Sequence, residues 1–179
     1  TTLFRSLSQT AASTLDIVVN NAGMGCICGI EEMTEEKFDE LFALNVKAPF
    51  FMVKHTLPRI NPGGRIINLS SFVTRVAFPS VGAYSMTKGS IDTMTLWLAK
   101  QLGPRQITVN AVSPGIINTD MNAAALSDPP SRKYMESLSA LGRVGESEDI
   151  ADVVAFLASD DSRWITGQCI EASGGSFLG

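Results

Sequence analysis

Residues 65–102, RIINLSSFVTRVAFPSVGAYSMTKGSIDTMTLWLAKQL, join a short apolar strand to a long helix. The strand ends beside Ser71, and open α/β sheets bind ligands at the carboxyl ends of their strands. The apolar stripe of residues 83–102 predicts a helix that opens with Tyr84 and Lys88. Side chains four positions apart share one helix face, so we expect this phenol and ammonium to point into one space beside Ser71.

These three side chains form a candidate acid–base site. A phenol has a pKa near 10, and lowering that pKa by ~3 units requires roughly 4 kcal/mol of preference for the phenolate. An ammonium at about 4 Å supplies ~4 kcal/mol at an effective dielectric constant near 20, so we expect Lys88 to lower the pKa of Tyr84. Ser71 would hold the substrate oxygen while Tyr84 passes a proton to or from an alcohol or a carbonyl.

Further apolar runs predict the strands of a parallel sheet. Residues 15–19 are rich in β-branched side chains, which is typical of a strand buried on both faces. Runs at 107–112 and 168–172 predict two more strands, and an amphipathic stripe at 150–157 predicts a surface helix between them. Residues 3–12 have the spacing of a helix end. The alternation of strands and helices indicates an α/β fold in a single domain.

A helix that begins after Thr34 contains a proline. Thr34 is a good N-cap, and the acidic residues that follow it suit the positive end of the helix dipole. Pro49 has no N–H and pushes on the carbonyl four residues earlier, which belongs to Asn45. We therefore expect a kink that leaves the Asn45 carbonyl free. The alternative is an asparagine that merely tolerates a bent helix.

The order of Ser71, Tyr84 and Lys88 resembles the catalytic signature of the short-chain dehydrogenase/reductase family. Other motifs follow that family's order along nearly the whole chain: Asn20-Asn21-Ala22-Gly23, Asn45-Val46, Asn68-Leu69-Ser70-Ser71, Asn110, Pro114-Gly115 with Thr119, and Gly174-Gly175. The resemblance implies a Rossmann-like, doubly wound parallel sheet and a nicotinamide cofactor, NAD or NADP. It also implies hydride transfer between that cofactor and a small-molecule carbonyl or secondary alcohol.

The resemblance further implies roles for individual residues. Tyr84 would be the general acid or base, and Ser71 would position the reacting oxygen. Lys88 would bind the nicotinamide ribose, and Asn45 would complete a proton relay through its carbonyl. The cofactor-binding residues implied in the same way are Asn21, Ala22, Gly23, Tyr84, Lys88, Pro114, Gly115, Ile117 and Thr119. Taken without the resemblance, 20–23 and 114–115 are well-formed turns.

Residues 120–142 contain a Pro129-Pro130 break and only short helical patches. Long loops on a compact domain are usually lids or binding loops, so we expect this segment to cover the substrate. In the family, the helices matching residues 44–57 and 83–102 form subunit contacts, which implies a homodimer or homotetramer.

A glycine-rich phosphate loop normally opens a dinucleotide fold, and no such loop precedes residue 15. We therefore expect that the N-terminal βαβαβ portion, roughly 60 to 80 residues at ~30 or more per βαβ unit, is missing from this sequence. Residues 15–19 would then form an apolar sheet edge. Two alternatives stay open: a truncated, non-catalytic dimerisation module, and an epimerase or dehydratase on the same scaffold.

Composition favours a small-molecule partner. The 179 residues carry a net charge of −4 and have a pI near 5.0, which argues against a nucleic-acid surface. No apolar run reaches the roughly 18 residues that span a bilayer, so we expect no membrane partner and a cytoplasmic protein. Cys26, Cys28 and Cys169 are too few for a disulfide framework. A zinc site needs four ligands and His55 is the single histidine, so we expect no metal.

Overall fold

The computed structural model describes residues 14–178, so the helix end predicted at 3–12 lies outside the described residues. Four parallel strands form one sheet in the order β1-β2-β3-β4. Their bounds are β1 Leu15–Asn20, β2 Ile60–Leu69, β3 Thr108–Pro114 and β4 Cys169–Ala172. The α/β class and the parallel sheet expected from the sequence are confirmed.

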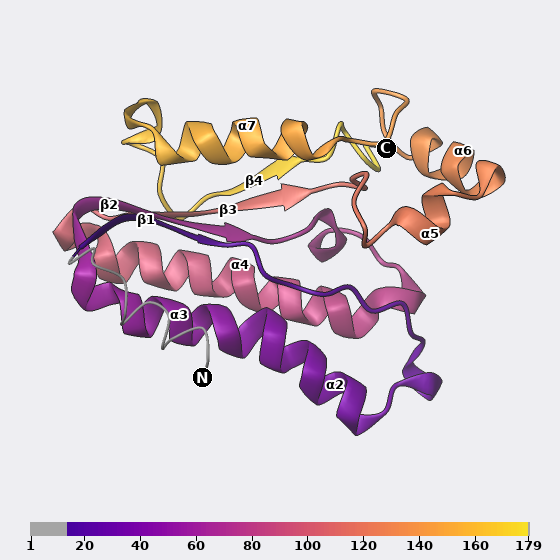
Figure 1. The fold of residues 1–179 in the computed structure, drawn as a ribbon, viewed down its shortest axis with the longest axis horizontal. Coiled ribbons are helices and arrows are strands. Elements are labelled where there is room, and N and C mark those ends of the chain that lie inside the picture. The colour runs from indigo at the N-terminus through magenta and orange to yellow at the C-terminus, as the bar shows by residue number, and fades with distance from the viewer. Residues whose placement is uncertain (1–13, 179) are drawn as a thin grey trace.

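Helices cover both faces of this sheet (Figure 1). On one face lie α2 (Glu35–Phe42), α3 (Ala48–Thr56) and α4 (Gly82–Leu102), and on the other lies α7 (Ser147–Ala158). Two short helices, α5 (Ala123–Leu126) and α6 (Pro129–Ser137), lie beyond the carboxyl ends of the strands. No helix in the described part of the chain is long and apolar enough to cross a membrane.

Successive residues of a strand supply the two cores, because strand side chains alternate between faces. Ile66 packs with Val109 and with the apolar stripe of α4, and both side chains are fully buried. Ile67, the next residue, packs with Val112 and with Leu157 of α7. Double coverage explains why β2 and β3 are buried on both faces, including their polar residues Asn68 and Asn110.

The second strand is longer than the run at 65–69 that predicted it. β2 starts at Ile60, which pairs with Leu15, and the register shifts before Arg65 pairs with Ile17. Gly63 lies within this irregularity at φ +80°, a left-handed conformation that favours glycine. Gly63 and Gly64 therefore belong to an irregular stretch of strand.

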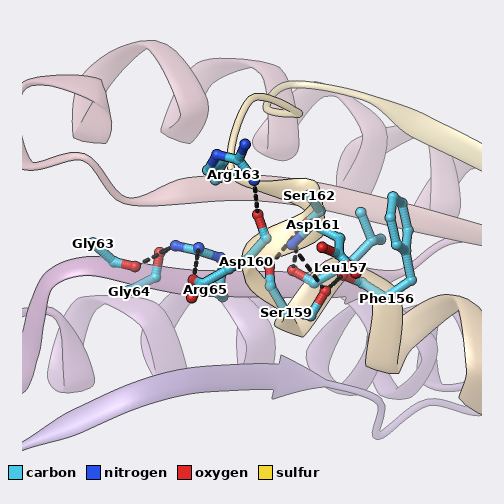
Figure 2. Close-up of polar contacts among 10 residues, drawn as sticks. All are labelled: Gly63, Gly64, Arg65, Phe156, Leu157, Ser159, Asp160, Asp161, Ser162 and Arg163. Carbon is cyan, nitrogen blue, oxygen red and sulfur yellow. Dashed lines mark hydrogen bonds and ion pairs between the residues drawn. The ribbon is translucent and has the colours of Figure 1, made fainter.

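Arg65 ties this part of β2 to the 3₁₀ turn Asp160–Ser162 that follows α7 (Figure 2). Its guanidinium donates to the carbonyls of Gly63 and Gly64 and lies 3.4 Å from the Asp160 carboxylate. Because Asp160 is almost fully exposed, solvent screens this ion pair. The cluster lies at the middle of β2, away from Ser71, which follows the end of the strand. It connects β2 to the segment after α7 and does not contribute to the site at Ser71.

The segment 120–142 is more helical than its sequence suggested. Pro129 and Pro130 were expected to break the chain, yet they occupy the first turn of α6. Proline is tolerated there because the first N–H groups of a helix lack intrahelical acceptors. Asp128 caps this helix, accepting hydrogen bonds from the Ser131 backbone at 3.0 Å and from its hydroxyl at 2.6 Å.

Candidate active site

Ser71 lies just beyond the carboxyl end of β2, at the edge of the sheet where parallel strands end. The strand ends at Leu69, and Ser71 caps the 3₁₀ turn Phe72–Thr74, its hydroxyl accepting from the Val73 N–H at 3.4 Å. The residue is buried at 7% exposure, and it lines a cleft of about 520 Å³. A serine hydroxyl is thus fixed at the point where ligands bind to open α/β sheets.

Helix α4 presents Tyr84 and Lys88 to the same cleft as Ser71. The Lys88 Nζ atom lies 5.7 Å from the centroid of the Tyr84 ring. It donates a hydrogen bond to the Leu69 carbonyl at 2.8 Å, which bridges the helix to the end of β2. The three side chains expected to share one space therefore do share it.

Burial governs the ionisation of both helix residues. Burial raises the pKa of Tyr84, and a hydrogen bond with Ser71 lowers it to a smaller extent. Burial lowers the pKa of Lys88 to about 8, opposed by the negative charge of Asp92. The pKa of Tyr84 is therefore raised overall, whereas the sequence predicted that it would be lowered. The ammonium is directed to the Leu69 carbonyl, and desolvation of the phenolate dominates.

Asn45 lies beneath the cleft and does not line it. It belongs to a π-helical turn, Ala43–Lys47, directly before α3 and Pro49. Its amide accepts from the Met24 N–H at 2.9 Å, and donates to the Met24 carbonyl at 2.8 Å and to the Thr87 hydroxyl at 3.2 Å. The local departure from α-helix agrees with the expected effect of Pro49, and the side chain fastens the loop after β1 to α4.

Most residues that the resemblance assigned to the cofactor line this cleft. They are Asn21, Gly23, Tyr84, Lys88, Pro114, Gly115, Ile117 and Thr119. Ala22 is exposed and lies outside the lining set. A Cβ on Gly23 would come within 3.3 Å of the Asn45 Oδ1 atom and 3.6 Å of the Lys88 Nζ atom. Gly23 therefore brings the backbone of this turn close to both side chains.

The Pro114-Gly115 turn has a packing requirement that its sequence did not reveal. A Cβ on Gly115 would lie 2.9 Å from the Ser173 backbone, a distance that forces a shift of the chain. Gly115 lines the cleft and also lies against Ser173, the residue that follows β4. Next along the chain, the Ile117 carbonyl accepts a hydrogen bond from the Asn122 amide at 2.9 Å.

Sequence reasoning missed one wall of the cleft. Strand β1, helix α7 and the loops contribute further lining residues: Val19, Met24, Met121, Asn122, Ser147, Ile150, Ala151 and Val154. The stripe at 150–157 predicted only contact with the sheet, and an apolar stripe does not distinguish core from cleft. The described residues contain no cluster of three or more side chains able to bind a metal, and the three cysteines are unpaired.

Replacing Lys88 with methionine should change how stability depends on pH. Below pH 8 both the native and the unfolded states hold the Lys88 proton, so the burial penalty is fully present. Between about 8 and 10.5 the native state releases the proton and the unfolded state keeps it, so stability rises with pH. Urea unfolding across this range should show the rise in the wild type relative to Lys88→Met.

Lys133→Met, at an exposed lysine of α6, controls for the loss of one positive charge. A difference between wild type and Lys88→Met that stays constant from pH 7 to pH 10 would contradict a lowered Lys88 pKa.

Comparisons with known proteins agree with this geometry. The family model described as Enoyl-(Acyl carrier protein) reductase matches residues 1–176. An uncharacterised oxidoreductase from Methylorubrum extorquens is 43% identical over 162 residues, which cover 90% of this chain and 65% of that protein. The chain belongs to the short-chain dehydrogenase/reductase family.

Other short-chain dehydrogenase/reductase proteins match over a similar extent. Versicolorin reductase from Emericella nidulans is 40% identical over 174 residues, covering 91% of this chain and 66% of that protein. The crystal structure of angucycline C-6 ketoreductase LanV with bound NADP superposes with a TM-score of 0.91 at 49% identity, covering 99% of this chain and 68% of that one. The chain thus spans about two thirds of the length of these relatives. The likeness confirms the Rossmann-like fold.

Proposed function

We propose that the protein is an NAD(P)-dependent reductase that transfers hydride to a ketone and donates a proton through Tyr84. The observation that carries this proposal is the meeting of Ser71, Tyr84 and Lys88 in one cleft at the carboxyl end of β2. A hydroxyl, a phenol and an ammonium in one enclosed site are the groups that general acid catalysis on a carbonyl requires.

The chemistry of the cleft fits the nicotinamide half of such a cofactor. Lys88 supplies an ammonium donor, and Asn21 and Thr119 supply an amide and a hydroxyl that can bind ribose hydroxyls and a carboxamide. The apolar side chains of Val19 and Ile150 line the same space. NAD and NADP are both compatible with these residues, and bound NADP in the LanV structure supports a cofactor of this class.

Reduction of a ketone adds a hydride to carbon and a proton to oxygen. Bound nicotinamide supplies the hydride. Tyr84 keeps its proton at neutral pH because burial raises its pKa, so its phenol can donate that proton to the carbonyl oxygen. Ser71 holds the oxygen beside Tyr84, and the Lys88 ammonium stabilises the phenolate that remains.

The substrate we propose is a ketone on a fused aromatic ring system. Leu69, Ile117, Met121 and Val154 give the cleft an apolar lining that suits such a surface. The names of several relatives refer to substrates with fused rings. One is a probable tetrahydroxynaphthalene reductase from Zymoseptoria tritici, which is 37% identical over 175 residues that cover 92% of this chain and 66% of that protein. Residues 120–142, with α5 and α6, would cover the bound substrate.

A panel of ketones and alcohols, assayed with both nicotinamides on protein of known intact mass, tests the proposal. We expect fused-ring ketones to be reduced faster than small aliphatic ketones. A tightly retained cofactor without net redox turnover would instead support an epimerase or dehydratase. Absence of both turnover and cofactor binding would support a non-catalytic dimerisation module.

We propose further that the chain forms a homodimer or homotetramer through α3 and α4. Phe50 and Trp97 stack across these helices with ring centroids 6.0 Å apart, yet they remain 40% and 49% exposed. Met86 and Leu96 extend the exposed apolar surface along α4. A contiguous patch of this kind is typical of a protein interface.

A charge at the centre of this patch should dissociate the subunits. We expect Trp97→Glu to reduce the molar mass measured by light scattering, because burying an unpaired carboxylate is costly. Tyr134→Glu, which places the same charge on exposed α6, should leave the mass unchanged. A wild-type protein that is monomeric at micromolar concentration would refute the proposed interface.

A further inference from the structure

A second polar cluster lies behind the cleft, on the sheet side of α4. Asp92 is at its centre, accepting a hydrogen bond from the Ser70 hydroxyl at 2.5 Å and from the Cys169 thiol at 3.2 Å. The Ser113 hydroxyl lies 2.9 Å from the same thiol. The cluster thus joins α4, the end of β2, β3 and β4 through one carboxylate.

Asp92 is placed to act on Lys88 of α4 and on Ser70 at the end of β2. It follows Lys88 by four positions on α4, so the two side chains share a helix face, and its negative charge opposes the effect of burial on the Lys88 pKa. Ser70, which Asp92 holds, lies between Leu69, the partner of Lys88, and Ser71. The strand end and the ammonium are therefore both tied to one carboxylate.

The charged and titratable groups that surround Asp92 come from three elements. Lys88 lies on its own helix, and Cys169 and Glu171 share one face of β4. Arg75, after the turn that follows Ser71, pairs with Glu171 at 3.2 Å. Arg75 and Glu171 thus pair with each other, and Asp92 is the single acidic residue of α4.

We propose that Asp92 is a positioning residue that keeps the Lys88 ammonium charged and fixes Ser70, and with it Ser71, against α4. This inference rests on the proposed function for its consequence in catalysis, although its effect on Lys88 is independent of any reaction. Asp92 does not itself line the cleft, whereas Ser70, which donates a hydrogen bond to it, does. It acts through Lys88 and through the strand end.

The test measures the protonation of Lys88 directly. Protein labelled with ¹³C-lysine is titrated by NMR, and the Lys88 signal is assigned from the spectrum of Lys88→Arg. The wild-type midpoint should lie near pH 8. Asp92→Asn, which keeps the shape and removes the charge, should lower this midpoint by about 0.5 pH unit or more. Asp152→Asn, at an exposed carboxylate on α7, removes the same charge and should leave it unchanged.

Two further measurements make every outcome informative. If Asp92→Asn does not fold, Asp92→Ser serves in its place, because a hydroxyl can accept hydrogen bonds from Ser70 and Cys169 without carrying charge. An unchanged midpoint in a folded, uncharged variant would overturn the inference. Ketone turnover is measured separately on the wild type. Absent turnover with a lowered midpoint would refute the proposed function alone.

Discussion

Tyr84→Phe should reduce ketone turnover by at least about 10²-fold while leaving the fold intact. The change removes a single hydroxyl from a side chain that lines the cleft beside Ser71 and Lys88. Burial keeps this phenol protonated, so its loss removes the acid that would protonate the carbonyl oxygen. Steady-state reduction assays with a saturating nicotinamide measure the effect.

Tyr134→Phe is the matched control, because Tyr134 is the second tyrosine of the chain and is 60% exposed on α6. The same atom is removed there without touching the lining of the cleft. Equal turnover in wild type and Tyr84→Phe would end the assignment of Tyr84 as the proton donor.

Asn45→Ala should lower the free energy of unfolding by about 2–4 kcal/mol, because it removes one buried and two partly buried hydrogen bonds. The Met24 N–H and carbonyl and the Thr87 hydroxyl all lose a hydrogen bond to an amide that is only 2% exposed. The loop after β1 should loosen, and with it the Gly23 backbone beside Lys88. Denaturant unfolding, followed by circular dichroism, measures the loss.

Asn61→Ala provides the comparison for this loss. Asn61 donates to the Asp16 carboxylate at 2.7 Å in an exposed contact, so water can replace the lost partner. Asn61→Ala should therefore lower the free energy of unfolding clearly less than Asn45→Ala does. Equal losses in the two variants would mean that Asn45 does not fasten the loop to α4.

The position of the site could be predicted from the sequence because it depends on local periodicity. A strand ending at Ser71 and a helix with Tyr84 and Lys88 four residues apart bring the three groups together whenever both elements form. The departure from α-helical geometry near Asn45 was equally local, since Pro49 lacks an N–H. Both features follow from residues that are close together in the sequence.

Properties set by three-dimensional packing could not be predicted in the same way. The pKa of Tyr84 depends on how deeply the phenol is buried, and burial outweighs the opposite effect of the hydrogen bond with Ser71. The need for glycine at position 115 arises from Ser173, which lies far along the chain and approaches through β4. The proline pair that was expected to interrupt 120–142 instead starts α6, because Asp128 supplies a cap.

The central claim is that Ser71, Tyr84 and Lys88 line a cleft that reduces ketones by hydride transfer. Its most direct test is a single turnover of a fused-ring ketone with reduced nicotinamide carrying deuterium at the transferable position, followed by mass spectrometry of the product. Our account predicts an alcohol with one deuterium on the former carbonyl carbon, formed at least about 10²-fold faster by the wild type than by Tyr84→Phe. An alcohol without deuterium, or labelled alcohol formed equally by both proteins, would contradict it.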